Sequence, residues 1–181
     1  MRLVGVLVAL GMLAMGADWP QFRGNSALTG VAAEGGPSGD LKLLWTWEGG
    51  EVFESSPVVA GGVVYIGAGT GDLIALELAT GKLKWKYKTG GELGESTPAG
   101  AVGGGVGWGG GWRGAAHAVS AGDGKGVWTF KTATEIKSSP VVSEGKVLVG
   151  SYDQNVYALE AKTGKLAWKF ETNGPVHATP A

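Results

Sequence analysis

The chain has 181 residues, a formal net charge of −1, 17% charged residues and no cysteine. Without cysteine there is no disulfide framework, zinc–thiolate site or thiol catalysis, and the length corresponds to one domain. The charges are interspersed and form no basic stripe, so we expect no nucleic-acid partner.

The first 17 residues have the pattern of a secretory signal peptide. One positive charge, Arg2, precedes an apolar run from Leu3 to Met15, and small residues up to Ala17 allow cleavage. The run is too short for a membrane span and is flanked as a removable signal is. The alternative is a buried N-terminal strand. We expect export to the periplasm or the extracellular space, with no lipid-attachment Cys and no membrane span.

Residues 18–41 are expected to form an N-terminal segment and a linker. The segment opens as Asp-Trp-Pro-Gln-Phe-Arg-Gly from Asp18 to Gly24. From Asn25 to Gly39 the residues are small, polar and rich in Gly, Pro and Ala, which is typical of a linker. We expect this linker to cross the ring of sheets that the following repeats predict.

The remainder, residues 42–181, repeats itself with a period near 40. Tryptophans mark the period at positions 45, 85, 128 and 168, spaced 40, 43 and 40. A second mark runs in step: Ser55-Ser56-Pro57, Ser96-Thr97-Pro98, Ser138-Ser139-Pro140 and Ala178-Thr179-Pro180. Self-similarity at such a period indicates a repeat architecture.

Each repeat contains four short, strand-like runs joined by tight turns. In the copy from Lys137 to Glu171 the runs alternate apolar and polar residues and are separated by Gly, Asn and Asp. Four strands in about 40 residues are one propeller blade. We predict an all-β fold: a β-propeller of four-stranded antiparallel blades, with about three complete blades plus partial ones in an incomplete ring. Leu43–Glu48 is expected to be an orphan last strand.

The middle repeat departs from its neighbours. Where the first repeat has Val-Val-Tyr-Ile-Gly, it has twelve residues dominated by glycine from Gly103 to Gly114. Glycine has no side chain to pack, so we expect the inner strands here to be the weakest part of the fold. Two G-x-G-x-x-G matches, at Gly105 and Gly109, lack the following helix that a dinucleotide loop needs. Whether residues 103–114 are genuine or the product of a reading-frame slip is left open.

The most regular feature of the repeats is an eleven-residue motif. Its residues are Ala75, Thr80, Gly81, Lys82, Trp85, Ala118, Gly124, Lys125, Trp128, Ala158, Thr163, Gly164, Lys165 and Trp168. This motif resembles the tryptophan docking motif of pyrroloquinoline-quinone (PQQ)-type propellers, Ala-x-Asp-x-x-Thr-Gly-Lys-x-x-Trp. The acidic position of that motif holds Glu77, Ser120 and Glu160 here. The opening from Asp18 is similar to the mature N-terminus of exported PQQ-like repeat proteins.

The resemblance implies one of two functional groups. Quinoprotein dehydrogenases bind PQQ and Ca²⁺ near the propeller axis and oxidise alcohols or sugars, whereas non-catalytic propellers include the scaffold of the outer-membrane barrel-assembly machine. Calcium needs six to eight converging oxygens. The glutamates here stand singly, and no residue matches a catalytic, cofactor-binding or metal-binding motif of the family. The scattered residues are Glu51, Glu54, Glu92, Glu95, Glu135 and Glu144.

The two histidines are not predicted to form a metal site. His117 and His177 lie 60 residues apart at unlike places in their repeats, without a second ligand at a metal-binding spacing. His117 holds the place that Ile74 and Tyr157 take in the other repeats, so we expect a packed or edge histidine. No Ser-His-Asp order or G-x-S-x-G elbow is present.

We therefore predict an exported, non-catalytic propeller module that binds or scaffolds protein partners and needs no cofactor. The chain is expected to be a fragment of a longer propeller, the alternative being self-association through exposed blade edges. The alternative function is a fragment of a PQQ- and Ca-dependent quinoprotein alcohol or sugar dehydrogenase.

Overall fold

The computed structural model describes residues 18–32, 39–50, 52–53, 55–90, 101–111 and 114–180. The predicted signal peptide, the Ser96-Thr97-Pro98 mark and four of the scattered glutamates (Glu51, Glu54, Glu92 and Glu95) lie outside these residues. Within them, twelve strands form three four-stranded sheets, each antiparallel and each in simple sequence order. The predicted four-stranded propeller blade is confirmed.

The first sheet follows the first repeat. It consists of β1 (Val58–Ala60), β2 (Val63–Gly67), β3 (Asp72–Glu77) and β4 (Leu83–Lys88). The β1–β2 turn places Gly61 and Gly62 at φ of 56° and 74°, a region that residues with a Cβ resist. Runs of Val, Ile and Leu between such turns favour short, buried strands.

The second and third sheets repeat this plan. The second contains β5 (Ala101–Gly103), β6 (Val106–Gly111), β7 (Ala115–Ser120) and β8 (Gly126–Lys131). The third contains β9 (Val141–Ser143), β10 (Lys146–Gly150), β11 (Asn155–Glu160) and β12 (Leu166–Glu171). The register between the last two strands shifts at the same place in all three sheets, immediately after Ala75, Ala118 and Ala158.

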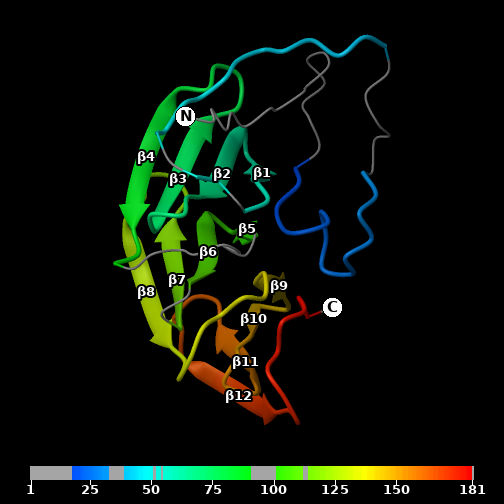
Figure 1. Cartoon of the computed structure of the whole chain (residues 1–181), viewed down its shortest axis with the longest axis vertical. Coiled ribbons are helices and arrows are strands. Elements are labelled where there is room, and N and C mark those ends of the chain that lie inside the picture. Colours follow the sequence, from blue (N-terminus) through cyan, green and yellow to red (C-terminus); the bar gives the residue numbers. More distant parts are fainter. Residues whose placement is uncertain are drawn as a thin grey trace.

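The three sheets follow one another along an arc, as Figure 1 shows. Strands β1, β5 and β9 lie on the inner side of this arc, and β4, β8 and β12 lie on the outer side. The blue N-terminal segment lies on the inner side, near β5 and β9. This is the arrangement of neighbouring propeller blades around an axis.

The apolar core lies between the sheets. One cluster joins the first and second sheets and includes Tyr65, Trp85 and Val119, and another joins the second and third and includes Trp108 and Val149. A third covers the other face of the first sheet, where Trp45, Trp47 and Phe53 pack against β2 and β3. Each sheet is therefore stabilised by its neighbours, as in repeat proteins generally.

In the first and third sheets, the first serine of the second repeat mark joins the segment before the sheet to the second strand of that sheet. The Ser55 hydroxyl donates to the Gly67 carbonyl and accepts from the Gly67 amide, both at 3.0 Å. Ser138 makes the same pair of bonds to Gly150, at 3.1 and 2.6 Å. The recurrence of this mark thus has a direct hydrogen-bonding cause.

One feature differs from what the sequence predicts. Among the described residues, Leu43–Glu48 contains an isolated bridge at Leu43 but no strand, so the expected orphan strand is wrong; the segment instead places Trp45 and Trp47 on the first sheet. The glycine-rich run forms strand β6, which pairs with β7 along its length and with β5 over Val106–Trp108. Backbone hydrogen bonding needs no side chains, so the glycines leave the pairing intact.

Candidate functional site

The repeat motif lies at the contacts between successive sheets. Trp85 packs on Gly124 of the second sheet, and its indole N–H donates to the Ala121 carbonyl at 3.0 Å. Trp128 repeats this on the third sheet with Gly164 and the Ala161 carbonyl, at 2.9 Å. Trp45, one period upstream, contacts Gly81 and donates to the Leu78 carbonyl at 2.8 Å. The same indole–turn contact therefore occurs three times.

The motif glycines are required at these turns for two reasons. Gly81, Gly124 and Gly164 have φ of 70°, 73° and 68°, which disfavours a Cβ. A Cβ on any of them would also lie within 2.7 Å of the preceding tryptophan ring. The motif alanines Ala75, Ala118 and Ala158 are fully buried and pair directly with Trp85, Trp128 and Trp168.

The Thr and Lys of the motif close the turn. Thr80 and Thr163 each accept a hydrogen bond from the amide of the lysine two residues on, Lys82 and Lys165. In the second sheet Asp123 takes this role, and its carboxylate lies 2.8 Å from the Lys125 ammonium. Hydrogen bonds from Lys125 and Ser120 lower the pKa of Asp123 to about 2.

The third sheet exposes the surface that the other two bury. Trp168 and Phe170 on β12 are 45% and 64% exposed, whereas Trp85 is 8% exposed at the equivalent position of the first sheet. Tyr87 and Phe130, the equivalents of Phe170, are partly buried. We call Trp168 and Phe170 the open face of β12.

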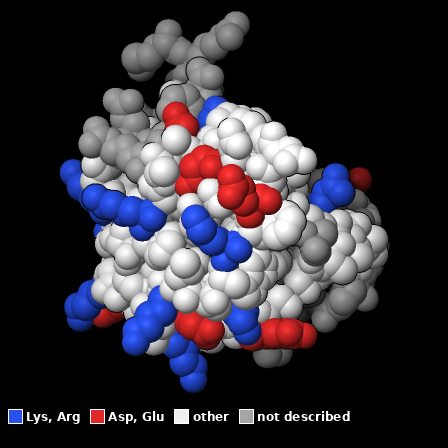
Figure 2. Space-filling model, turned by 90° about the horizontal axis from the view of Figure 1, so that it is seen from below, with Lys and Arg blue, Asp and Glu red and all other residues white. Residues whose placement is uncertain are grey.

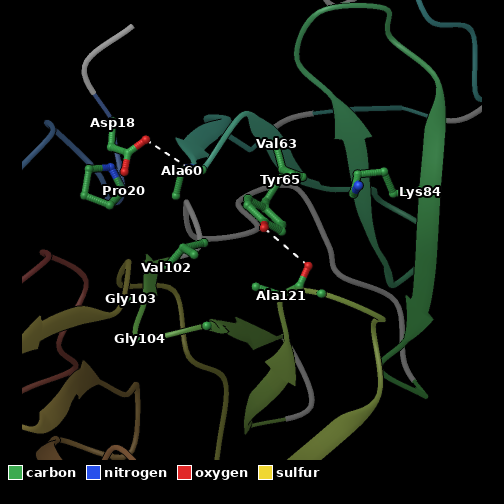
Figure 3. Close-up of a pocket in the computed structure, with 13 residues that line it drawn as sticks. Asp18, Pro20, Ala60, Val63, Tyr65, Lys84, Val102, Gly103, Gly104 and Ala121 are labelled. Carbon is green, nitrogen blue, oxygen red and sulfur yellow. Dashed lines mark hydrogen bonds between the residues drawn. The ribbon is translucent and has the colours of Figure 1, made fainter. Parts of the chain in front are cut away.

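A shallow pocket of about 440 Å³ lies between the first and second sheets (Figure 3). It is bordered by Asp18, Tyr65, Lys84, the β5–β6 turn and the loop at Ala121. The Tyr65 hydroxyl donates to the Ala121 carbonyl at 3.4 Å, and burial raises its pKa. These residues come from distant parts of the chain and share no motif, so sequence reasoning did not identify the pocket.

The histidines take different positions. His117 is 7% exposed on β7, where its Nδ1 lies 3.4 Å from the Tyr87 hydroxyl and 3.3 Å from that of Thr129. Burial lowers the pKa of His117. His177 lies beside Tyr152, with ring centroids 5.4 Å apart. Among the described residues no group of three or more His, Cys, Asp or Glu side chains could hold a metal ion.

Asp153 organises the β10–β11 loop. It accepts hydrogen bonds from the Tyr157 hydroxyl at 2.7 Å and from the Ala133 and Asn155 amides at 2.9 and 3.1 Å. Burial raises the pKa of Asp153, but these hydrogen bonds outweigh it and hold the pKa below its ordinary value. Burial, together with the hydrogen bond to Asp153, raises the pKa of Tyr157 to about 12. Asp153 thus joins Tyr157, Ala133 and Asn155 in a structural network, although the buried Oδ1 atom of Asn155 has no hydrogen-bond partner among the described residues.

On the face seen in Figure 2, small groups of Lys and Arg side chains (blue) and of Asp and Glu side chains (red) are separated by uncharged residues. In the part of the chain that the structure describes, no helix has the length and apolar character needed to cross a membrane.

Comparison with known proteins places these features in a family. The profile described as outer membrane protein assembly factor BamB matches residues 29–106 and 112–181. The protein of that name from Burkholderia pseudomallei is 32% identical over 141 residues, covering 72% of this chain and 34% of the relative. The dehydrogenase subunit of the quinone alcohol dehydrogenase of Gluconobacter oxydans is 30% identical over 161 residues, covering 74% and 21%.

A solved structure shows the same fold. The quinohemoprotein alcohol dehydrogenase from Comamonas testosteroni superposes with a TM-score of 0.74 at 25% identity, covering 86% of this chain and 27% of the enzyme. The chain thus spans about a third or less of the length of these proteins. Both functional groups implied by the sequence occur among its relatives. The matched profile covers most of the three sheets and their tryptophan–glycine contacts, and the chain belongs to the family of PQQ-like β-propellers described as outer membrane protein assembly factor BamB.

Proposed function

We propose that this chain is an exported, non-catalytic propeller module that binds protein partners, and that the open face of β12 is a contact surface for a further propeller sheet. The observation that carries the proposal is the exposure of Trp168 and Phe170, at 45% and 64%. Large apolar side chains grouped on a sheet face favour a protein contact. Relatives described as outer membrane protein assembly factors support a role in assembly.

The chain itself indicates what the partner surface should contain. At the other sheet contacts the tryptophan packs on a glycine at positive φ and donates to the carbonyl three residues earlier. We expect the partner to present such a glycine turn to Trp168. A turn with a bulkier residue would overlap the ring, since a Cβ on Gly164 would lie 2.5 Å from Trp128.

Site-specific photo-crosslinking tests the proposal. A photoreactive phenylalanine analogue at Phe170 should crosslink one defined protein in periplasmic extract, through a peptide containing a glycine turn. The control is the same analogue at Val127, which is 47% exposed but lies on β8 in the second sheet. Equal, diffuse crosslinking from both positions would show that the open face of β12 is not a contact surface.

The second candidate is a fragment of a quinoprotein dehydrogenase, favoured by the likeness to the Gluconobacter and Comamonas enzymes. Among the described residues, no group of three or more His, Cys, Asp or Glu side chains could hold a Ca²⁺ ion. Titration with PQQ and Ca²⁺, followed by tryptophan fluorescence, tests this candidate. Saturable quenching, together with dye reduction by an alcohol, would replace the scaffold proposal by the enzyme.

A further inference from the structure

Three equivalent strand edges face the inner side of the arc. Val59 on β1, Val102 on β5 and Val142 on β9 hold the same register position, opposite Val64, Gly107 and Val147 respectively. Among the described residues, each belongs to the innermost strand of its sheet and has a strand of that sheet on one side only. Unpaired N–H groups on such edges are ready to bind an extended chain.

The N-terminal segment satisfies all three of these amides with successive residues. The Val59 amide donates to the Trp19 carbonyl at 2.9 Å, and the Val102 amide donates to the Pro20 carbonyl at 2.7 Å. The Val142 amide donates to the Oε1 atom of Gln21 at 3.2 Å. Residues 19, 20 and 21 therefore bind the first, second and third sheets in turn.

Further contacts hold this segment in place. The Trp19 amide donates back to the Val59 carbonyl at 2.7 Å, and the Gly61 amide donates to the Asp18 carboxylate at 2.9 Å. Figure 3 shows Asp18 and Pro20 beside Ala60 and Val102. Gln21 is only 5% exposed, and its carbonyl accepts from the Gly24 amide at 2.8 Å, which closes a turn. A buried side-chain amide aimed at a backbone N–H is a specific contact, since its loss leaves that N–H unsatisfied.

We propose that the inner edges of β1, β5 and β9 form one binding track for an extended peptide, and that Asp18–Gln21 occupies it as an intramolecular strap. The track recognises backbone and amide carbonyls, through the repeated amides of Val59, Val102 and Val142. The strap joins three sheets that otherwise contact mainly their nearest neighbours. It stands independently of the proposed contact surface, because it lies on the opposite, inner strands of the sheets.

Amide hydrogen exchange followed by NMR on the full chain tests the strap directly. In the unmodified protein the amides of Val59, Val102 and Val142 should all be strongly protected, although they lie on edge strands. Gln21→Met keeps the side-chain length but removes the acceptor. It should accelerate exchange at Val142 by at least about tenfold, while Val59 and Val102, bound by backbone carbonyls, change much less.

The control substitution is Asn25→Ala. Asn25 lies in the same segment but, among the described residues, it bonds to Thr29 and Leu28, so the three amides should keep their protection. Rapid exchange of the three amides in the unmodified chain would overturn the proposal, whatever the fate of the variants. Unchanged exchange at Val142 in Gln21→Met would also overturn it.

Binding in trans tests the track itself. A fluorescent peptide with the sequence of residues 18–23, Asp-Trp-Pro-Gln-Phe-Arg, should bind the Gln21→Met chain several-fold more tightly than the unmodified chain, whose own strap competes. A scrambled peptide of the same composition should bind neither. Equal binding of both peptides to both chains would show that the inner edges do not select this segment.

Discussion

At the residue scale, the glycine of each motif turn is more tightly constrained than the threonine position that precedes it. Gly164 combines a φ of 68° with a tryptophan ring so close that a Cβ would lie 2.5 Å from Trp128. Backbone conformation and close approach thus impose the same residue. The threonine position, by contrast, accepts Asp123 in the second sheet, because a carboxylate can receive the same amide hydrogen bond.

The close approach of Trp128 predicts that two turn glycines of the third sheet differ in how much their substitution destabilises the fold. Gly164→Ala should destabilise the chain by about 2–4 kcal/mol, through left-handed backbone strain and overlap with Trp128. Gly145 has a similar φ of 74° but nothing within 4 Å of its Cβ position, so Gly145→Ala should cost only about 1–2 kcal/mol. Urea unfolding measures both. Equal losses would mean that contact with Trp128 contributes nothing.

A second residue-scale prediction concerns pH. The pKa of Asp153 is held below its ordinary value, so its ionised form stabilises the fold at neutral pH. Asp153→Asn should cost about 1 kcal/mol or less at pH 7, because the group is partly exposed to solvent. The difference in unfolding free energy between the two proteins should disappear as the pH falls from about 3.9, the ordinary pKa of an aspartate, through the lower pKa that Asp153 has in the folded state. Unfolding curves at pH 7 and through the acid range measure it; a pH-independent difference would contradict the assignment.

At the element scale, the glycine-rich strand β6 shows which strand features depend on side chains. Its ladder to β5 and β7 is complete, but Gly107 and Gly109 stand where the other sheets have Val64 and Ile66, or Val147 and Val149. Those residues are buried and pack against the preceding layer. Strand β6 therefore keeps its hydrogen bonds and loses apolar burial.

Adding a side chain at a glycine of β6 should stabilise the second sheet. At Gly109 a Cβ would meet only Leu73 Cδ1, at 3.8 Å, which is an ordinary contact. Gly109→Ala should therefore raise stability by about 0.5–1 kcal/mol, since the unfolded chain loses freedom and no strain is introduced. Thermal unfolding measures this. Gly104→Ala, at a φ of 57° in the adjoining turn, should instead destabilise; a loss from both would contradict the packing argument.

At the scale of the whole molecule, the two ends of the arc differ in how much apolar surface they expose. The outer face of the first sheet is covered by Trp45, Trp47 and Phe53, whereas the open face of β12 exposes Trp168 and Phe170. A stack of sheets needs a covering at each end, because every sheet buries an apolar face against its neighbour. Within these three sheets, the open face of β12 is therefore where a further sheet would bury the most apolar surface.

We expect this face to drive association at high protein concentration. The double substitution Trp168→Ser and Phe170→Ser should weaken self-association at least about tenfold, equivalent to about 1.4 kcal/mol. Sedimentation velocity over a concentration series measures the change. Val127→Ser removes a similarly exposed residue from β8 and should have little effect. Equal weakening of self-association by the double substitution and by Val127→Ser would indicate non-specific hydrophobic association rather than association through the open face.

The features that the sequence predicts best are those in which a local pattern repeats. The period near 40 residues, the turn glycines and the alternating runs determined the four-stranded blade, because turn conformation and strand alternation depend on near neighbours in the chain. The sequence did not reveal that Leu43–Glu48, whose apolar alternation is that of a strand, forms only an isolated bridge at Leu43 in the part of the chain that the structure describes. It also gave no sign of the pocket beside Tyr65 and Lys84, which draws on distant loops.

The amino-acid sequence by itself determined the blade, the motif and the family, since each follows from a short pattern repeated at a fixed spacing. Only the tertiary structure decided which tryptophan is buried and which is exposed: Trp85 and Trp168 have the same local motif, and their surroundings differ only through the next sheet. The same holds for Asp18–Gln21. Its contacts with Val59, Val102 and Val142 join residues up to 121 positions apart, and such contacts exist only once three sheets have come together.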